Sequence, residues 1–282
     1  MPSRRTFLRA SATALLASAV AGIVRAGGDE FFAYLPTVER YPPPTPVPTE
    51  EPTEEPTATP EDPPPGPTDD APIVGPATGT AAQALAWLAP RADASYTDYD
   101  LAQILQAYRE LGESVGMDWF LAVAQMAHET GNLTSFWSLR PQRNPAGIGV
   151  TGQWSSTPPP DTTGWAYNYQ RARWEVGLSF ATWAGDSAPA HLGRLLAYAL
   201  RDEDASDAQR ALIARALAYR PLPADRRGVA PRWVDLNGRW AVPGTTYGQS
   251  IIDLARRMRG EIYTADAPLS GAEDGDWMPP EG

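Results

Sequence analysis

The sequence predicts an α+β fold that is mostly α-helical, with a small β-hairpin or sheet flanking a cleft. Apolar residues recur at helical spacing in five segments between residues 97 and 258. Residues 143–180 break this pattern, because glycine and β-branched residues come first and alternating aromatic residues follow. The contrast indicates one small β element between the second and third helices.

The first two expected helices carry end signals. Residues 97–100 (Thr-Asp-Tyr-Asp) form a capping box, and the apolar face that follows comprises Leu101, Ile104, Leu105, Tyr108 and Leu111. Residues 117–130 are apolar on most sides and stop before Gly131, a residue suited to a helix C-cap. Hydrophobicity all round a helix predicts a buried central helix.

Three further helices follow the β element. The third runs through residues 191–199, the fourth begins near Ser206, and the last spans about 246–258. Each places apolar residues at intervals of three or four, which predicts one buried face per helix.

Composition divides the chain into four parts. Residues 1–26 form a signal segment, 27–77 a Pro/Thr/Glu-rich linker, 78–263 the folded domain and 264–282 an acidic tail. Residues 36–76 hold 15 of the 30 prolines, and such a segment lacks the apolar side chains that offset ordering entropy. We therefore expect a disordered linker and tail around one folded domain.

The N-terminus carries an export signal. Residues 3–9 (Ser-Arg-Arg-Thr-Phe-Leu-Arg) are similar to the twin-arginine motif, and an apolar run and a tolerable cleavage site at 24–26 follow. The apolar run is shorter than the ~20 residues of a membrane-spanning helix, so we expect no stable membrane insertion after cleavage. Export with a long spacer suits a protein secreted by the twin-arginine route and associated with the cell wall.

The net charge of −11 belongs to the flanks of the domain. Residues 41–78 hold eight acidic residues and 264–282 hold five, with no basic residue in either, whereas 79–263 hold 18 of each sign. A domain without excess positive charge lacks the basic surface that binds phosphate groups, so we expect no nucleic-acid partner. The chain has no cysteine and no lysine, which excludes disulfides, thiolate metal sites and Schiff-base chemistry.

Three short motifs match other kinds of site but lack their context. Residues 147–152 have the glycine spacing of a dinucleotide loop, yet no apolar strand precedes them. His128 and Glu129 are followed by Asn132, where a zinc-protease helix needs a second histidine. Residues 185–189 faintly match a serine-nucleophile loop, in a chain too helical for that scaffold. We therefore expect no metal and no organic cofactor.

Glu129 ends the most apolar of the expected helices, and Phe136 and Trp137 follow it closely. A carboxyl group at the mouth of an apolar region loses hydration, which disfavours its charged form and raises its pKa. A general acid that works near neutral pH needs such a pKa. The alternative is an ordinary surface glutamate at a helix end.

Four segments form a recognisable series. Residues 125–131 (Gln-Met-Ala-His-Glu-Thr-Gly) end a helix, and 144–148 (Asn-Pro-Ala-Gly-Ile) form a turn. Residues 180–192 lead into the next helix, and 240–247 (Trp-Ala-Val-Pro-Gly-Thr-Thr-Tyr) end in a tyrosine. In this order, over about 101–258, the segments resemble the glucosaminidase family of lysozyme-like peptidoglycan hydrolases, the mannosyl-glycoprotein endo-β-N-acetylglucosaminidase-like enzymes.

The resemblance implies a lysozyme-like helical fold that cleaves β-1,4 glycosidic bonds of peptidoglycan, typically after N-acetylglucosamine. It places Glu129 at the family's general acid and Tyr247 at a catalytic tyrosine in the cleft. The turn with Asn144, Gly147 and Ile148 would bind the sugar. Two family features are missing, namely the carboxylate of a Thr-x-Glu-Tyr motif and the aspartate before the proline of the last segment.

A mechanism with two carboxylates needs a base or nucleophile opposite the acid. Glu175 is the preferred candidate, ahead of Asp161 and Asp186, because it lies in an alternating segment near the expected sheet. Two alternatives stay open. Glu175 could instead pair with Arg171 and Arg173, and the acetamido group of the substrate could replace a second carboxylate.

Nine of the ten tryptophans lie in the domain, and most large aromatic side chains belong to cores. Trp137, Trp154 and Trp165 have polar, loop-like surroundings, so we expect them to stack on sugar faces. The leading hypothesis is a monomeric, exported peptidoglycan hydrolase whose partner is the glycan strand. The alternatives are a lytic transglycosylase, in which Glu129 is both acid and base, and a non-catalytic cell-wall-binding module.

Overall fold

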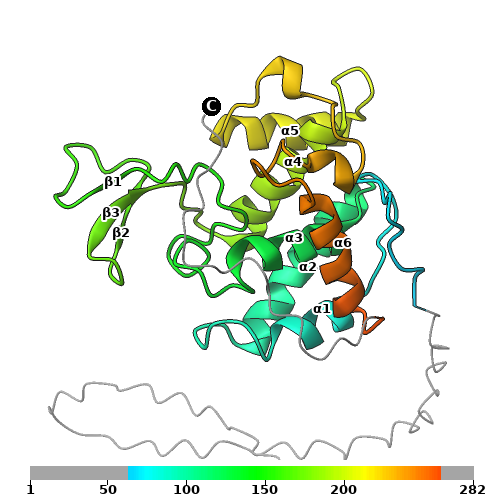
Figure 1. The fold of residues 1–282 in the computed structure, drawn as a ribbon, viewed down its shortest axis with the longest axis horizontal. Coiled ribbons are helices and arrows are strands. Elements are labelled where there is room, and N and C mark those ends of the chain that lie inside the picture. The colour runs from blue at the N-terminus through cyan, green and yellow to red at the C-terminus, as the bar shows by residue number, and fades with distance from the viewer. Residues whose placement is uncertain (1–62, 262–282) are drawn as a thin grey trace, which may run out of the picture. The chain divides into compact units, whose positions relative to one another are not determined.

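The computed structural model describes residues 63–261, which form six α-helices and a three-stranded antiparallel sheet (Figure 1). In chain order the elements are α1 (Ala81–Leu88), α2 (Asp98–Ser114), α3 (Trp119–Thr130), β1 (Trp154–Ser155), β2 (Trp165–Asn168), β3 (Arg173–Val176), α4 (Ala188–Ala199), α5 (Asp207–Tyr219) and α6 (Tyr247–Met258). The expected class, mostly helical with one small sheet, is confirmed. The signal segment, most of the linker and the whole tail lie outside the described residues.

All five helices expected from the apolar spacing are present as α2 to α6. The capping box at the start of α2 also forms, because Thr97 and Asp100 each accept the other's backbone N–H, at 3.2 and 2.9 Å. Helix α1 was not expected, since its eight residues are too short to display a periodic pattern.

Helix α3 is the buried centre of the helical part, as its sequence predicts. Ten of its 12 residues are buried, and it packs against α1, α2, α4 and α6. The carboxylate of Asp118 caps the first turn by accepting the N–H groups of Phe120 and Leu121 at 3.1 and 3.2 Å. The position of α3 fixes where Glu129, its penultimate residue, must lie.

The folded domain begins before residue 78, so the expected end of the linker at residue 77 is wrong. Ala71 and Ile73 are buried in the main core. The N–H of Ile73 donates to the carbonyl of Pro231 at 2.9 Å, and the N–H of Trp233 donates to the carbonyl of Ala71 at 3.0 Å. Two apolar side chains and this backbone pairing order a segment whose composition matches that of the linker.

The sheet has the order β1-β3-β2, and Figure 1 draws it to one side of the helices. Trp154 and Ala166 both pair with Glu175, whereas Tyr167 pairs with Trp174. Because successive side chains of a strand point to opposite faces, the first three residues share one face and the last two share the other.

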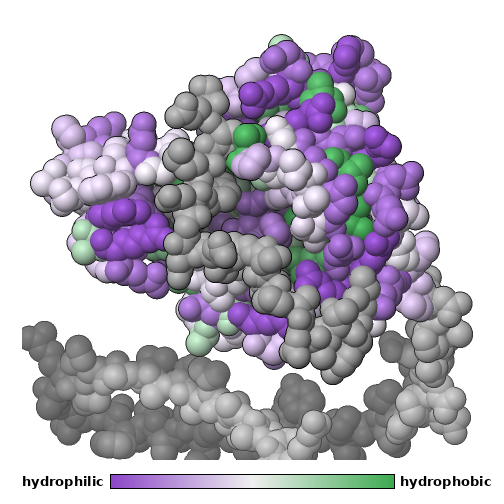
Figure 2. Space-filling view, viewed as in Figure 1, coloured by the Kyte–Doolittle hydropathy of each residue, from purple (hydrophilic) through white to green (hydrophobic). Residues whose placement is uncertain are grey.

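A second, smaller apolar cluster joins the β region to the helices. It contains Ala146, Ile148, Phe180 and Ala190 and so links the loop after α3 to α4. The face in Figure 2 is largely hydrophilic over its described residues, with hydrophobic ones in small groups. Between residues 63 and 261, no helix has the length and hydropathy needed to cross a membrane.

Candidate active site

Glu129 is half-buried one residue before the end of α3, where the chain turns sharply away. The hydroxyl of Thr130 donates to the carbonyl of Met126 at 2.6 Å and accepts the N–H of Leu133 at 2.8 Å. Gly131 then takes a left-handed conformation with φ 58°. The Glu-Thr-Gly sequence therefore ends the helix directly behind the carboxyl group.

Two side chains from the C-terminal part of the domain donate to the same carboxyl oxygen of Glu129. The indole N–H of Trp240 lies 3.0 Å from Oε1, and the hydroxyl of Tyr247 also donates to Oε1. No partner of Oε2 is recorded within residues 63–261. One oxygen is thus held by two donors, while the other keeps its hydrogen-bonding capacity.

The loop before α6 is anchored so that Trp240 and Tyr247 reach Glu129. The side chain of Asn237 donates to the carbonyl of Thr245 at 2.8 Å and accepts the N–H of Gly248 at 2.7 Å. A Cβ at Gly248 would lie 2.2 Å from the carbonyl oxygen of Trp233, so only glycine permits this close approach. The backbone around α6 therefore has little freedom to withdraw the two donors.

Burial raises the pKa of Glu129 from 4.5 to about 7, although hydrogen bonds from Tyr247 and Trp240 lower it. Loss of hydration is the larger effect, because the carboxyl group lies against the apolar end of α3. A carboxyl group with this pKa keeps its proton up to neutral pH, which is what general acid catalysis requires.

Both histidines of the chain lie near this carboxyl group without forming a metal site. His128 is exposed, but its ring lies 5.7 Å from that of Tyr247, and the partial loss of hydration there lowers its pKa. His191 is fully buried, and burial lowers its pKa to about 3, so its ring is neutral. No cluster of three or more possible metal ligands occurs in the described part of the chain.

Asn144 holds its turn together. Its side-chain amide donates to the carbonyls of Ile148 and Leu178 at 2.8 and 2.9 Å. Its oxygen accepts the N–H groups of Ala146 and Ile148 at 3.3 and 2.9 Å. Gly147 takes φ 60°, and both Asn144 and Ile148 are buried. Neither buried side chain offers a polar group to a sugar, so this turn acts as a scaffold.

The carboxylate of Glu175 forms ion pairs with two arginines. One carboxyl oxygen lies 2.7 Å from Arg173 and 3.5 Å from Arg171, and Asn168 donates to the other at 3.3 Å. The structure therefore contains the alternative expected for this residue, a glutamate paired with arginine. Both oxygens are engaged, which makes Glu175 a poor nucleophile.

The other two candidate carboxylates are occupied locally. Asp161 is exposed and accepts the N–H of Thr163 at 2.8 Å. Asp186 accepts from Thr182 and from the hydroxyl of Tyr219, each at 3.0 Å. The pKa of Asp186 is lowered, because these hydrogen bonds together outweigh the partial burial. Neither carboxylate is linked to Glu129 by any recorded contact of the described residues.

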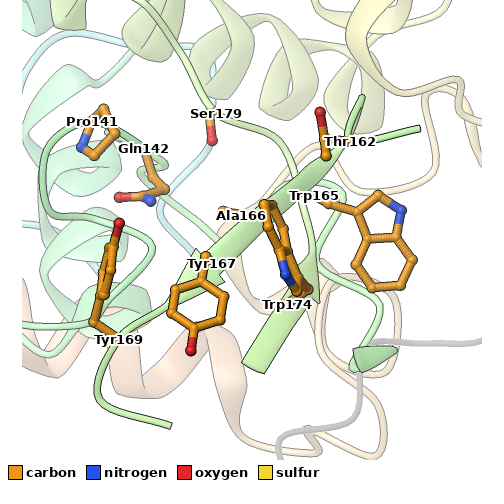
Figure 3. Close-up of a pocket in the computed structure, with 9 residues that line it drawn as sticks. All are labelled: Pro141, Gln142, Thr162, Trp165, Ala166, Tyr167, Tyr169, Trp174 and Ser179. Carbon is orange, nitrogen blue, oxygen red and sulfur yellow. The ribbon is translucent and has the colours of Figure 1, made fainter. Parts of the chain in front are cut away.

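An aromatic hollow of about 350 Å³ lies on one face of the sheet (Figure 3). Its walls combine aromatic rings with a few polar groups, from Pro141, Gln142, Thr162, Trp165, Ala166, Tyr167, Tyr169, Trp174 and Ser179. The rings of Tyr167 and Trp174 lie 5.5 Å apart, and those of Tyr167 and Tyr169 lie 4.9 Å apart. We call this concave surface the aromatic hollow. Its rings present faces of the kind that stack on sugars.

The three tryptophans expected to stack on sugars lie in different places. Trp165 lines the aromatic hollow. Trp154 is 57% exposed on the opposite face of the sheet, with the guanidinium of Arg173 5.2 Å from its ring centroid. Trp137 is half-buried against Gly177, where an added Cβ would lie 2.5 Å from its ring. Of these three tryptophans, Trp165 is the one that belongs to the aromatic hollow.

Trp240 and Gln125 belong to the site but were not expected from the sequence. Trp240 opens the last segment of the resemblance, and an aromatic donor at that position was the one available signal. Gln125 lies on the buried face of α3, where its spacing gave no indication of a polar role. Comparisons with protein-family models, with curated proteins and with solved structures find no match for this chain.

Proposed function

We propose that this protein is an exported, lysozyme-like glycoside hydrolase that cleaves β-1,4 bonds in the glycan strand of peptidoglycan. The observation that carries the proposal is the Glu129 carboxyl group, with Oε1 held by two donors, Oε2 free of recorded partners and a pKa of about 7. A structural glutamate would also use the two hydrogen bonds, but it would not need a proton that persists to neutral pH. A proton donor to a glycosidic oxygen needs that proton and a carboxyl oxygen that is not already hydrogen-bonded.

In the proposed reaction, the protonated Oε2 of Glu129 donates to the glycosidic oxygen as the bond to the anomeric carbon breaks. The carboxylate formed is stabilised by Trp240 and Tyr247, which already point at Oε1. These donors need no rearrangement during the step, so their contribution is available when charge develops.

The positive charge that develops on the sugar requires a second group. Since Glu175 is paired with Arg173 and Arg171, the acetamido group of an N-acetylated sugar is the better supported nucleophile. Attack by the acetamido oxygen gives a cyclic intermediate that water opens. This route would also select N-acetylated sugars, which agrees with a peptidoglycan substrate.

The aromatic hollow, whose lining does not include Glu129, would give a saccharide a separate place to bind. Aromatic rings present apolar faces to the C–H groups of a sugar, and the side chains of Gln142 and Thr162 supply polar contacts at the edge. The signal segment and the linker suggest where a monomer would meet such a polymer, namely outside the cytoplasm and within the wall.

A lytic transglycosylase is the second candidate, and the arginine pairing of Glu175 favours it. With no free second carboxylate beside Glu129 among the described residues, Glu129 could act first as acid and then as base. The sugar's own hydroxyl would then close an anhydro ring in place of attack by water.

Digestion of purified peptidoglycan by the wild-type protein and by Glu129→Gln tests these alternatives. Mass spectrometry of the products should reveal new reducing ends for hydrolysis and anhydro ends for transglycosylation. Glu129→Gln should release neither product. Equal release by both proteins would reject the catalytic assignment, and retention of the polymer without cleavage by either would indicate a wall-binding module.

A further inference from the structure

A continuous line of polar side chains runs from Glu129 into the core. Tyr247 donates to Glu129, and the side-chain nitrogen of Gln125 donates to the Tyr247 oxygen at 2.6 Å. The Gln125 oxygen lies 2.8 Å from Nε2 of His191, and Nδ1 of that ring lies 2.8 Å from the hydroxyl of Tyr108. These five side chains, here called the polar chain, come from α2, α3, α4 and α6.

The inner members of the polar chain are completely buried. Gln125, His191 and Tyr108 have no exposed surface. Polar groups in such a place are costly unless every donor and acceptor is satisfied. An apolar core could fill the same space, so the polar chain needs a reason beyond packing.

One direction of donation gives every hydroxyl hydrogen and the ring hydrogen of the polar chain an acceptor. Tyr108 donates to Nδ1 of His191, and Nε2–H of His191 donates to the oxygen of Gln125. The Gln125 nitrogen then donates to Tyr247, whose own hydrogen is left for Glu129. In this direction the hydroxyl of Tyr247 is always a donor.

The reverse direction leaves a buried donor without an acceptor. It would put the ring hydrogen of His191 on Nδ1, facing the Tyr108 oxygen. The hydroxyl hydrogen of Tyr108 would then have no acceptor, since His191 is its one recorded partner in residues 63–261. In that state Tyr247 would accept, and Glu129 would carry its proton on Oε1, turned away from a substrate.

We propose that Gln125, His191 and Tyr108 are positioning residues that hold the Tyr247 hydroxyl as a donor to Oε1 of Glu129. The acidic proton of Glu129 then stays on Oε2, where a glycosidic oxygen can receive it. The role of this proton rests on the proposed function, whereas the direction of the polar chain can be measured without any substrate.

The titratable and charged groups around the polar chain are few. His128 packs its ring against Tyr247 and has Arg257 as its charged neighbour. On α4, the guanidinium of Arg194 lies 6.0 Å from the ring centroid of Trp240, and Tyr198 also faces that ring. Burial, rather than any of these charges, is the leading cause of the pKa shifts of Glu129 and His191.

Nuclear magnetic resonance of the full-length protein with ¹⁵N-labelled histidine tests the direction. The chain has two histidines, and His128→Gln removes one set of signals, so the ring of His191 is assigned directly. We expect a neutral His191 with its hydrogen on Nε2 between about pH 5 and 8. A hydrogen on Nδ1 in the wild-type protein would overturn the proposal without any further variant.

Tyr108→Phe tests the coupling between the far end of the polar chain and Glu129. We expect the ¹⁵N signal of Nδ1 to shift as this nitrogen loses its donor, and the pKa of Glu129, followed by ¹³C carboxyl shifts, to rise by about half a unit as Tyr247 is held less firmly as a donor. Tyr96→Phe is the matched control, because it also removes a hydroxyl that is buried, one that donates to the Ser138 carbonyl at 2.6 Å. That control should leave both signals unchanged.

An unaltered Glu129 pKa in Tyr108→Phe would reject the proposal. So would an equal change in Tyr96→Phe, because the effect would then be a general loss of packing. If the wild-type protein fails to cut peptidoglycan while these signals behave as expected, the positioning role stands and the proposed function fails. Cleavage of peptidoglycan without the expected signals would support the proposed function and reject the positioning role.

Discussion

The indole nitrogen of Trp240 lies 3.0 Å from a carboxyl oxygen of Glu129, although the two residues are 111 positions apart in the sequence. The ring of Trp240 is itself held between side chains of α4, 5.8 Å from the ring of His191 and 5.7 Å from that of Tyr198. The donor is therefore fixed by packing before any substrate arrives, and its removal has a measurable consequence.

Trp240→Phe should keep most of the packing and lose the donor. The pKa of Glu129 should rise above its value of about 7, because the hydrogen bond from Trp240 lowers it. We expect kcat on peptidoglycan fragments to fall by about ten- to a hundredfold, since a hydrogen bond to a charged group contributes about 1.5–3 kcal/mol. Tyr198→Phe is the control, as it alters the surroundings of Trp240 without touching Glu129. An equal loss of kcat in the control would reject the role of the indole donor.

Glu129→Gln should change how stability depends on pH. In the unfolded chain the carboxyl group ionises near its usual pKa of 4.5, while in the folded protein it keeps its proton up to about 7. Stability from this group is therefore complete below pH 4.5 and is lost as pH rises through 7, by at most about 3 kcal/mol. Urea unfolding at about pH 5 and 8.5 should reveal a smaller decline for Glu129→Gln. Parallel declines in the two proteins would contradict the raised pKa.

The helices could be predicted from the sequence because their signals are local. The capping box at Thr97 and the all-round apolar character of α3 each depend on neighbours within a few turns. The core position of Ile73 could not be predicted, because its backbone partner, Pro231, lies in a distant part of the chain. The composition around Ile73 suggested a linker, but hydrogen bonding to a distant segment makes these residues part of the folded domain.

The same contrast holds within the candidate site. Glu129 was identifiable from the order of the four motif segments, since its place at the end of an apolar helix also fits a surface glutamate. The donors at Trp240 and Gln125 act through contacts that no periodic pattern encodes. For Glu175 the neighbouring arginines were visible, but only the geometry decides between a nucleophile and an ion pair. Local charge patterns thus supplied the alternatives for this residue.

Glu175→Gln should weaken the sheet and spare the chemistry. Arg173 and Arg171 would lose their partner, and we expect a loss of about 1–2 kcal/mol in the free energy of unfolding, since one of the arginines is largely exposed. The kcat on peptidoglycan fragments should stay within about threefold, because acetamido attack needs no second carboxylate. A fall in kcat by about a thousandfold with the fold intact would make Glu175 the nucleophile and reject the acetamido route.

Tyr169→Ala should weaken substrate binding if the aromatic hollow receives the glycan. Tyr169 is 84% exposed, so its removal should change the free energy of unfolding by less than about 0.5 kcal/mol. Loss of one ring face should raise KM for glycan fragments about fivefold with kcat nearly unchanged, because an aromatic contact contributes about 0.5–1.5 kcal/mol. Trp154→Ala removes a similarly exposed ring from the opposite face of the sheet and should leave KM as it is. The reverse ranking of the two variants would move the glycan to the face that carries Glu175.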